Sequence, residues 1–168
     1  MRIESVRADE DQQVFIVRTW RGSYSFPFGT ADPAPDMVNP VEEVFVDEEL
    51  AMEGFTYRLA SGVEGSVLLD QVLDYNQDPA YLRNMLLYKL TLEAQRQLRV
   101  TSLSKREIIR RLGTSPAQFY RLIDQTNYTK SIDKVLSLLA VLGCDVELRV
   151  HSCGRASGEG APAHAAQR

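Results

Sequence analysis

The chain has few of the features that mark membrane, secreted or metal-binding proteins. No apolar run among its 168 residues approaches the roughly 18 residues that a membrane-spanning helix needs. The N-terminus has no basic region followed by an apolar run, so no secretory signal is visible. Cys144 and Cys153 lie outside any metal-type spacing. We therefore expect reduced thiols in a cytoplasmic protein that does not enter a membrane.

Signatures of catalysis are also missing. The sequence has no glycine-rich phosphate loop, no nucleophile elbow and no paired acid and base motif. His151 and His164 have no ligand partners at useful spacing. The acidic residues between Glu42 and Glu49 are interpreted as an exposed strand and turn, not a cation site, and Trp20 is expected in the core. We expect no enzymatic activity, no cofactor and no metal.

The net charge of −4 hides a division along the chain. Residues 1–78 hold 16 acids and 5 bases, a net charge of −11, whereas residues 79–150 hold 6 acids and 12 bases, a net charge of +6. Such asymmetry favours a basic part that faces nucleic acid and an acidic part that DNA repels. The alternative is two ordinary solvated surfaces.

The first 75 residues are interpreted as a small acidic, β-rich domain. β-Branched and aromatic residues are dense there, and glycine, proline and aspartate mark the turns. Leucine and valine at helical spacing predict a short helix at 66–75. The expected strands lie within 3–28, at 41–46 and at 55–59.

Residues 79–150 are interpreted as a helical domain. Asp78 can cap and Pro79 can open a long helix that runs to about Leu98. A later helix begins after Ser131 and stops at Gly143.

Two segments follow that helix. Residues 145–150 alternate strictly between apolar and charged side chains, which predicts a half-buried strand. Residues 151–168 have no periodicity and are expected to be a disordered tail.

Two helix starts separated by a tight turn stand at the centre of this domain. Ser104 is followed three residues later by Glu107, and Ser115 by Gln118, so that each pair predicts a capping box. Gly113 is expected to end the first helix in the left-handed conformation. Two short helices joined by such a turn form a helix-turn-helix, which places its second helix in the major groove of DNA.

Residues 104–142 resemble the lambda-repressor-like or Xre-type helix-turn-helix family. The matching features are a Leu-Ser helix opening, an Arg-Leu-Gly-Thr-Ser turn, an Arg-Leu pair late in the second helix and a leucine-rich helix ending in Leu-Gly. The resemblance covers roughly residues 80–143 and implies a dimeric DNA reader, often a repressor or the antitoxin of a toxin–antitoxin pair. The chain departs from the family at Ile109, where alanine is usual, and at 124–127, where a glycine-containing loop is common.

The predicted recognition helix turns Phe119, Leu122 and Ile123 inward. Arg121 and Ala117 are the stronger base readers if Gln118 is engaged in its capping box, and Tyr120 packing on the neighbouring helix is an open alternative. The candidate base-reading residues are Pro116, Ala117, Gln118, Tyr120 and Arg121. The candidate phosphate contacts, which position the protein without specifying sequence, are Lys105, Arg106, Asn127, Tyr128 and Lys130.

We therefore expect an α+β protein with an N-terminal β-rich domain, a helix-turn-helix domain and a C-terminal strand. The sequence predicts a repressor-like transcriptional regulator that binds double-stranded DNA as a homodimer. One alternative is an antitoxin whose acidic part masks a basic toxin, and another is a helical protein that never meets DNA. The strand at 145–150 either pairs with its symmetry mate or completes the N-terminal sheet of its own chain.

Overall fold

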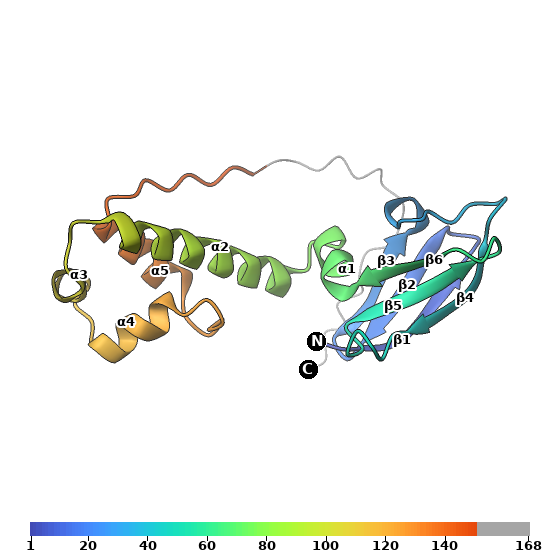
Figure 1. The fold of residues 1–168 in the computed structure, drawn as a ribbon, viewed down its shortest axis with the longest axis horizontal. Helices are drawn as coiled ribbons and strands as arrows, with labels where there is room; N and C mark the ends of the chain where they lie inside the picture. The colour runs from blue at the N-terminus through green and yellow to red at the C-terminus, as the bar shows by residue number, and fades with distance from the viewer. Residues whose placement is uncertain (151–168) are drawn as a thin grey trace, which may run out of the picture.

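The computed structural model describes residues 1–150 and has the mixed α+β fold that the sequence predicts. Strands fill the first part of the chain and helices the rest (Figure 1). The strands lie at one end, helices α3 to α5 lie at the other, and the long helix α2 joins the two (Figure 1). The predicted disordered tail, residues 151–168, lies outside the described residues.

Two antiparallel three-stranded sheets form the N-terminal unit. Each is a meander, because every strand pairs with the next along the chain, and β1 runs beside β4. The phenyl ring of Phe15 lies 4.7 Å from that of Phe28 and 5.0 Å from that of Phe55, centroid to centroid, which closes an aromatic core between the sheets. The elements are β1 (Ile3–Asp9), β2 (Val14–Thr19), β3 (Gly22–Pro27), the short 3-10 helix η1 (Phe28–Thr30), β4 (Val41–Val46), β5 (Gly54–Leu59) and β6 (Glu64–Leu68).

The sixth strand corrects the predicted helix at 66–75. Helix α1 (Leu69–Tyr75) begins only at Leu69, after β6 has paired with β5. Gly65 and Val67 are buried and alternate with exposed neighbours, which is the period of a strand. The sequence pattern missed β6 because its inward positions hold a glycine and a single valine, which give little hydrophobic signal.

Trp20 is 73% exposed, so the prediction that it lies in the core is wrong. Thr19 pairs with Gly22, which leaves Trp20 and Arg21 as the two residues of the turn between β2 and β3. A turn residue of a hairpin lies beyond the pleated face that packs on the core. The Arg21 guanidinium lies 5.8 Å from the centroid of the exposed indole.

Helix α2 (Pro79–Val100) is anchored to the N-terminal unit by Asp78. The Asp78 carboxylate accepts hydrogen bonds from the amides of Ala80 (3.1 Å) and Tyr81 (2.9 Å), which caps the helix as predicted. It also accepts a bond from the Tyr24 hydroxyl of β3 (3.0 Å). Burial alone would raise the pKa of Asp78, but these donors together hold that pKa below its ordinary value.

A second hydrophobic core holds the helical unit together. Helices α4 (Pro116–Ile123) and α5 (Ile132–Val141) pack against α2, and helix α3 (Lys105–Leu112) packs against α5 (Figure 1). Its buried side chains are Leu87, Ala94, Ile108, Phe119, Leu122, Val135, Leu138 and Leu139. No helix within residues 1–150 is long and apolar enough to cross a membrane.

Residues 145–150 form no strand, which corrects the prediction of a C-terminal strand in the chain's own fold. The two sheets contain only β1 to β3 and β4 to β6, so this segment does not complete the N-terminal sheet. The segment leaves the helical unit as an extended chain (Figure 1). Alternating side chains alone cannot make a strand, because a strand requires a neighbour to take its main-chain hydrogen bonds.

Candidate nucleic-acid interface

The tight turn predicted between α3 and α4, here called the corner, is present in the structure. Gly113 has φ 60° and ψ 36°, the left-handed conformation, and its amide donates to the carbonyl of Arg110 (3.1 Å). The hydroxyl of Ser104 accepts from the Glu107 amide and that of Ser115 accepts from the Gln118 amide, each at 3.2 Å. These serines therefore cap the two helices as the sequence predicts.

The Glu107 side chain has a different role from the one that a capping box gives it. Its carboxylate accepts from Arg110 at 2.6 and 2.8 Å and from Arg111 at 2.8 Å. Hydrogen bonds from Arg110 and then from Arg111 lower the pKa of Glu107 to about 2. The positive charges of these two arginines are thus partly balanced within α3.

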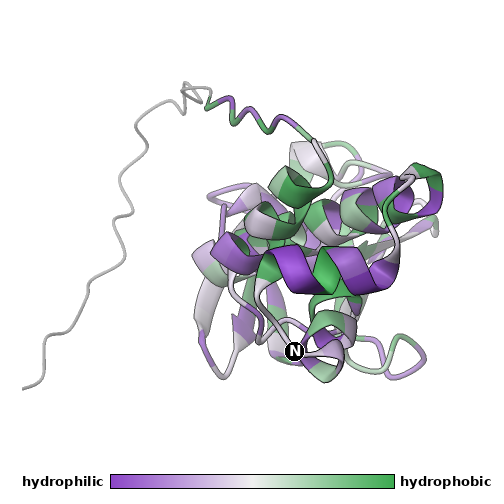
Figure 2. Cartoon of the chain, turned by 90° about the vertical axis from the view of Figure 1, so that its left-hand side faces the viewer, coloured by the Kyte–Doolittle hydropathy of each residue, from purple (hydrophilic) through white to green (hydrophobic). Residues whose placement is uncertain are grey.

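The outward face of α4 carries all five predicted base-reading residues. Phe119 and Leu122 are buried against the other helices, as the apolar spacing predicts. The exposed residues are Pro116, Ala117, Gln118, Tyr120 and Arg121. Figure 2 views the molecule from this end, with hydrophobic and hydrophilic bands alternating along the helices. The helix therefore presents a mixed apolar and polar surface, and a major groove is wide enough to admit a helix.

Tyr120 combines the two roles that the sequence left open. Its ring meets that of Phe119 edge-on at 5.6 Å, yet 54% of the residue is exposed. The ammonium group of Lys105, in the first turn of α3, lies 5.8 Å from the centre of the Tyr120 ring. This cation–π contact brings a phosphate-binding candidate to the edge of the α4 surface. Arg106, the other basic residue in that turn, is exposed.

Arg121 is the basic side chain of α4 and differs from Arg110 and Arg111 of α3. Within residues 1–150, no carboxylate pairs with the Arg121 guanidinium, whereas Glu107 binds both Arg110 and Arg111. A shallow hollow of about 250 Å³ separates Arg121 and Gln118 from Lys134 on α5. Sequence analysis missed Lys134. Its signal was a basic residue in the first turn after Ser131, but only the packing of α4 on α5 brings that turn close to Arg121.

Lys130 is buried, which corrects its assignment as a phosphate contact. Only 9% of the residue is exposed, and its ammonium group donates to the carbonyls of Leu122 (3.0 Å) and Asp124. Burial lowers the pKa of Lys130, and the Asp124 carboxylate opposes that shift. Lys130 thus holds the loop after α4 to the end of that helix instead of facing solvent.

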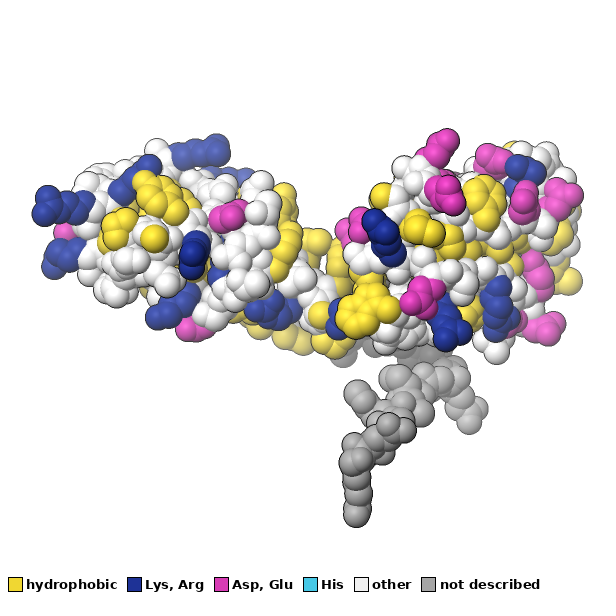
Figure 3. Space-filling model, turned by 90° about the horizontal axis from the view of Figure 1, so that it is seen from below, with side chains coloured by type: hydrophobic (Ala, Val, Ile, Leu, Met, Phe, Trp, Pro, Cys, Tyr) yellow, Lys and Arg dark blue, Asp and Glu magenta, His cyan; other side chains and the backbone are white. Residues whose placement is uncertain are grey.

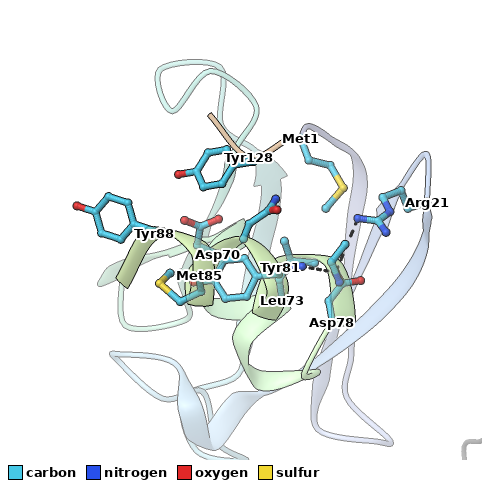
Figure 4. A pocket seen from close by; sticks show the side chains of 11 residues that line it. Met1, Arg21, Asp70, Leu73, Asp78, Tyr81, Met85, Tyr88 and Tyr128 are labelled. Atoms are coloured by element: carbon cyan, nitrogen blue, oxygen red, sulfur yellow. Dashed lines mark hydrogen bonds and ion pairs between the residues drawn. The ribbon is translucent and has the colours of Figure 1, made fainter. Parts of the chain in front are cut away.

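The other two candidates for phosphate contact in this loop are Asn127 and Tyr128, and they also have structural roles. Asn127 donates to the Arg121 carbonyl (3.1 Å) and accepts from the Thr129 amide (3.1 Å), so its amide group shapes the loop. Tyr128 lies on another side of the molecule, beside the start of α2. There it lines a cavity of about 450 Å³ together with Met1 and Arg21 of the N-terminal unit (Figure 4). The structure therefore does not bring Tyr128 to the exposed face of α4.

Charge is divided between the two ends of the molecule. Figure 3 shows Lys and Arg side chains around the helical end and most of the Asp and Glu side chains at the strand end. Within the described part of the chain, no group of three or more His, Cys, Asp or Glu side chains could hold a metal ion.

Comparisons of the chain with protein-family models, curated proteins and solved structures found no match.

Proposed function

We propose that the protein is a sequence-specific DNA-binding transcriptional regulator that reads the major groove with α4. The observation that carries the proposal is the exposed row on α4 that ends in Arg121, whose guanidinium is paired with no carboxylate of residues 1–150. Arginine recognises guanine through two parallel hydrogen bonds, and glutamine recognises adenine in the same way. In this proposal Arg121 and Gln118 read bases and Ala117 contacts a thymine methyl group.

The electrostatics around α4 support the same proposal. Lys105 lies at one edge of the exposed face and Lys134 at another, where each could meet the phosphate backbone of a duplex. The acidic N-terminal unit lies at the opposite end of the molecule (Figure 3). A duplex that approached along α4 would therefore avoid the repulsion of that unit. The proposed setting is the cytoplasm, where a regulator reaches chromosomal DNA.

The test begins by selecting the preferred site from random duplexes and then measuring binding by fluorescence anisotropy across salt concentrations. We predict that Arg121→Ala weakens binding to the selected site by about 1–3 kcal/mol and barely changes binding to random DNA. Lys105→Ala should weaken both and reduce the slope of log affinity against log salt by about 1.

A matched control is Arg96→Ala, since Arg96 is an exposed arginine of α2 that pairs with Glu93. It should leave both affinities unchanged. An equal loss on selected and random DNA with Arg121→Ala would remove Arg121 as a base reader. A wild-type protein without retention on DNA at low salt would refute the proposed function.

A second candidate function is that of an antitoxin. The acidic N-terminal unit favours it, because a strongly acidic surface suits a basic protein partner, and Trp20 of the same unit is an exposed aromatic side chain of the kind that anchors protein interfaces. In this case a small basic toxin encoded beside the protein would cause growth arrest, and the protein would relieve that arrest by binding the toxin. Trp20→Ala should then abolish that relief while DNA binding through α4 stays intact.

A further inference from the structure

Residues 145–150 present an unusual combination of apolar side chains and free main chain. The exposed fractions of Val146, Leu148 and Val150 are 45%, 74% and 85%. Within residues 1–150, the last main-chain hydrogen bond before the end runs from the Cys144 amide to the Leu139 carbonyl, and none follows it. An extended segment in this condition is a template for pairing with another strand.

The charged side chains of the segment alternate with the apolar ones. Glu147 and Arg149 pair with each other at 3.1 Å across the intervening leucine, so both lie on the side opposite to Leu148. The backbone of this segment is therefore already extended with its two kinds of side chain separated, as a strand requires.

We propose that residues 146–150 pair antiparallel with the same segment of a second copy, about a two-fold axis at Leu148. In this register Leu148 lies opposite Leu148 of the partner, and Val146 lies opposite Val150 of the partner. Glu147 lies opposite Arg149 of the partner, and the symmetry repeats that pair. The apolar side chains then share one face of the ribbon, and two intermolecular ion pairs share the other.

The neighbouring registers are less favourable. A two-fold axis at Glu147 sets Asp145 opposite Arg149 of the partner but places two glutamates directly opposite each other at its centre. An axis at Arg149 places two arginines there. An axis at Val146 sets Asp145 opposite Glu147, again with like charges. Like charges directly across a ladder are destabilising. Parallel pairing in register has the same fault, so the charge sequence selects the antiparallel register at Leu148.

A two-stranded ribbon is marginal in water unless its apolar face is covered. A groove of about 500 Å³ lies where the segment leaves α5, and its lining is part apolar and part polar. It is lined by Leu90, Glu93 and Gln97 of α2, by Leu139 of α5 and by Leu142 just after α5. Residues 145–147 already form one wall of this groove. Val150 of the partner, opposite Val146, would lie at its edge, so the ribbon and the groove would cover one another's apolar surface.

The pairing gives the proposed regulator two recognition helices related by a two-fold axis, and in this respect it rests on the proposed function. A two-fold dimer reads two half-sites on one duplex. Dimer formation itself is measured without DNA. A monomer that still selects a DNA site would overturn the pairing and leave the proposed function standing, and a dimer that ignores DNA would do the reverse.

The experiment is sedimentation equilibrium of the full chain, without DNA, over a range of micromolar concentrations. Wild type should be a dimer. Glu147→Arg and Arg149→Glu should each raise the dimer dissociation constant by about tenfold or more, because each replaces two opposite-charge pairs by two like-charge pairs. The double variant, with both charges exchanged, should restore the wild-type constant.

Mixing the two single variants provides the sharper test. One chain then carries two positive charges at 147 and 149 and the other carries two negative charges, so a heterodimer regains both ion pairs. The mixture should dimerise as wild type does. A monomeric wild type, or single variants that dimerise unchanged, would overturn the proposal. If Arg149→Glu abolished dimerisation while Glu147→Arg left it unchanged, the register at Glu147 would be favoured, because Arg149 faces Asp145 of the partner there. That result would overturn the register proposed.

Discussion

Replacing Lys130 by methionine tests the assignment that changed most between sequence and structure. Methionine keeps much of the length of the buried side chain but lacks the ammonium group. In the wild-type protein that group donates to the carbonyl oxygens of Leu122 (3.0 Å) and Asp124, at the end of α4. The variant therefore leaves both carbonyls without their donor while changing the packing little.

The expected loss follows from the burial of these two carbonyls. A buried polar group without a partner costs about 1–3 kcal/mol. The bond to Leu122 is buried and incurs this cost, whereas the bond to Asp124 is only partly buried, so water can replace the donor there. Removing the charge also relieves the desolvation that lowers the pKa of Lys130. We predict a net loss of about 1–3 kcal/mol in the free energy of unfolding.

The measurement is urea denaturation followed by circular dichroism at the helical signal. Lys134→Met is the matched control, because Lys134 is an exposed lysine of the adjacent helix. It should change the free energy of unfolding by less than about 0.5 kcal/mol. The structural role would be refuted if Lys130→Met left stability unchanged but reduced the slope of log DNA affinity against log salt by about 1. Lys130 would then be a phosphate contact, as the sequence predicted.

Three further predictions concern the corner and its caps. A Cβ at position 113 meets open space, so the positive φ alone sets the cost of a substitution there. Gly113→Val should destabilise the fold by about 1–3 kcal/mol, and Gly113→Asn by much less, because asparagine tolerates the left-handed conformation; equal melting temperatures for both would contradict this. Ser115→Ala should cost about 1 kcal/mol of stability in denaturant titrations by removing the bond to the Gln118 amide. Because the folded pKa of Glu107 is about 2 and its ordinary value is 4.5, its ion pairs stabilise the fold above pH 4.5 and are lost as pH falls towards 2. Glu107→Gln should flatten the acid-induced fall in melting temperature over that range.

The helix boundaries around the corner were predictable because their causes are local. Ser104, Ser115 and Asp78 cap helices through amides two or three residues away, and Gly113 supplies a backbone conformation that few residues adopt. The inward face of α4 was predictable for the same reason, since helical periodicity within eight residues fixes which side is apolar.

The errors occurred where the pairing of one strand with its neighbour decides the outcome. β6 exists because β5 offers its edge to Gly65 and Val67, and Trp20 is exposed because hairpin register sets it in a turn. Neither register is visible in the residue pattern of one segment, since a register is a relation between two strands.

The sequence by itself determined the division of charge, the two capped helices with their glycine corner, and the row of side chains from Pro116 to Arg121 that faces outward. Only the tertiary structure decided which basic residues share that face. Lys130 is buried and donates to two carbonyls, Tyr128 lines a cavity at the N-terminal end of α2, and Lys134 lies across a shallow hollow from Arg121. The physical reason is that a cation's role depends on the acceptors that packing places around it, and those acceptors belong to other helices and loops.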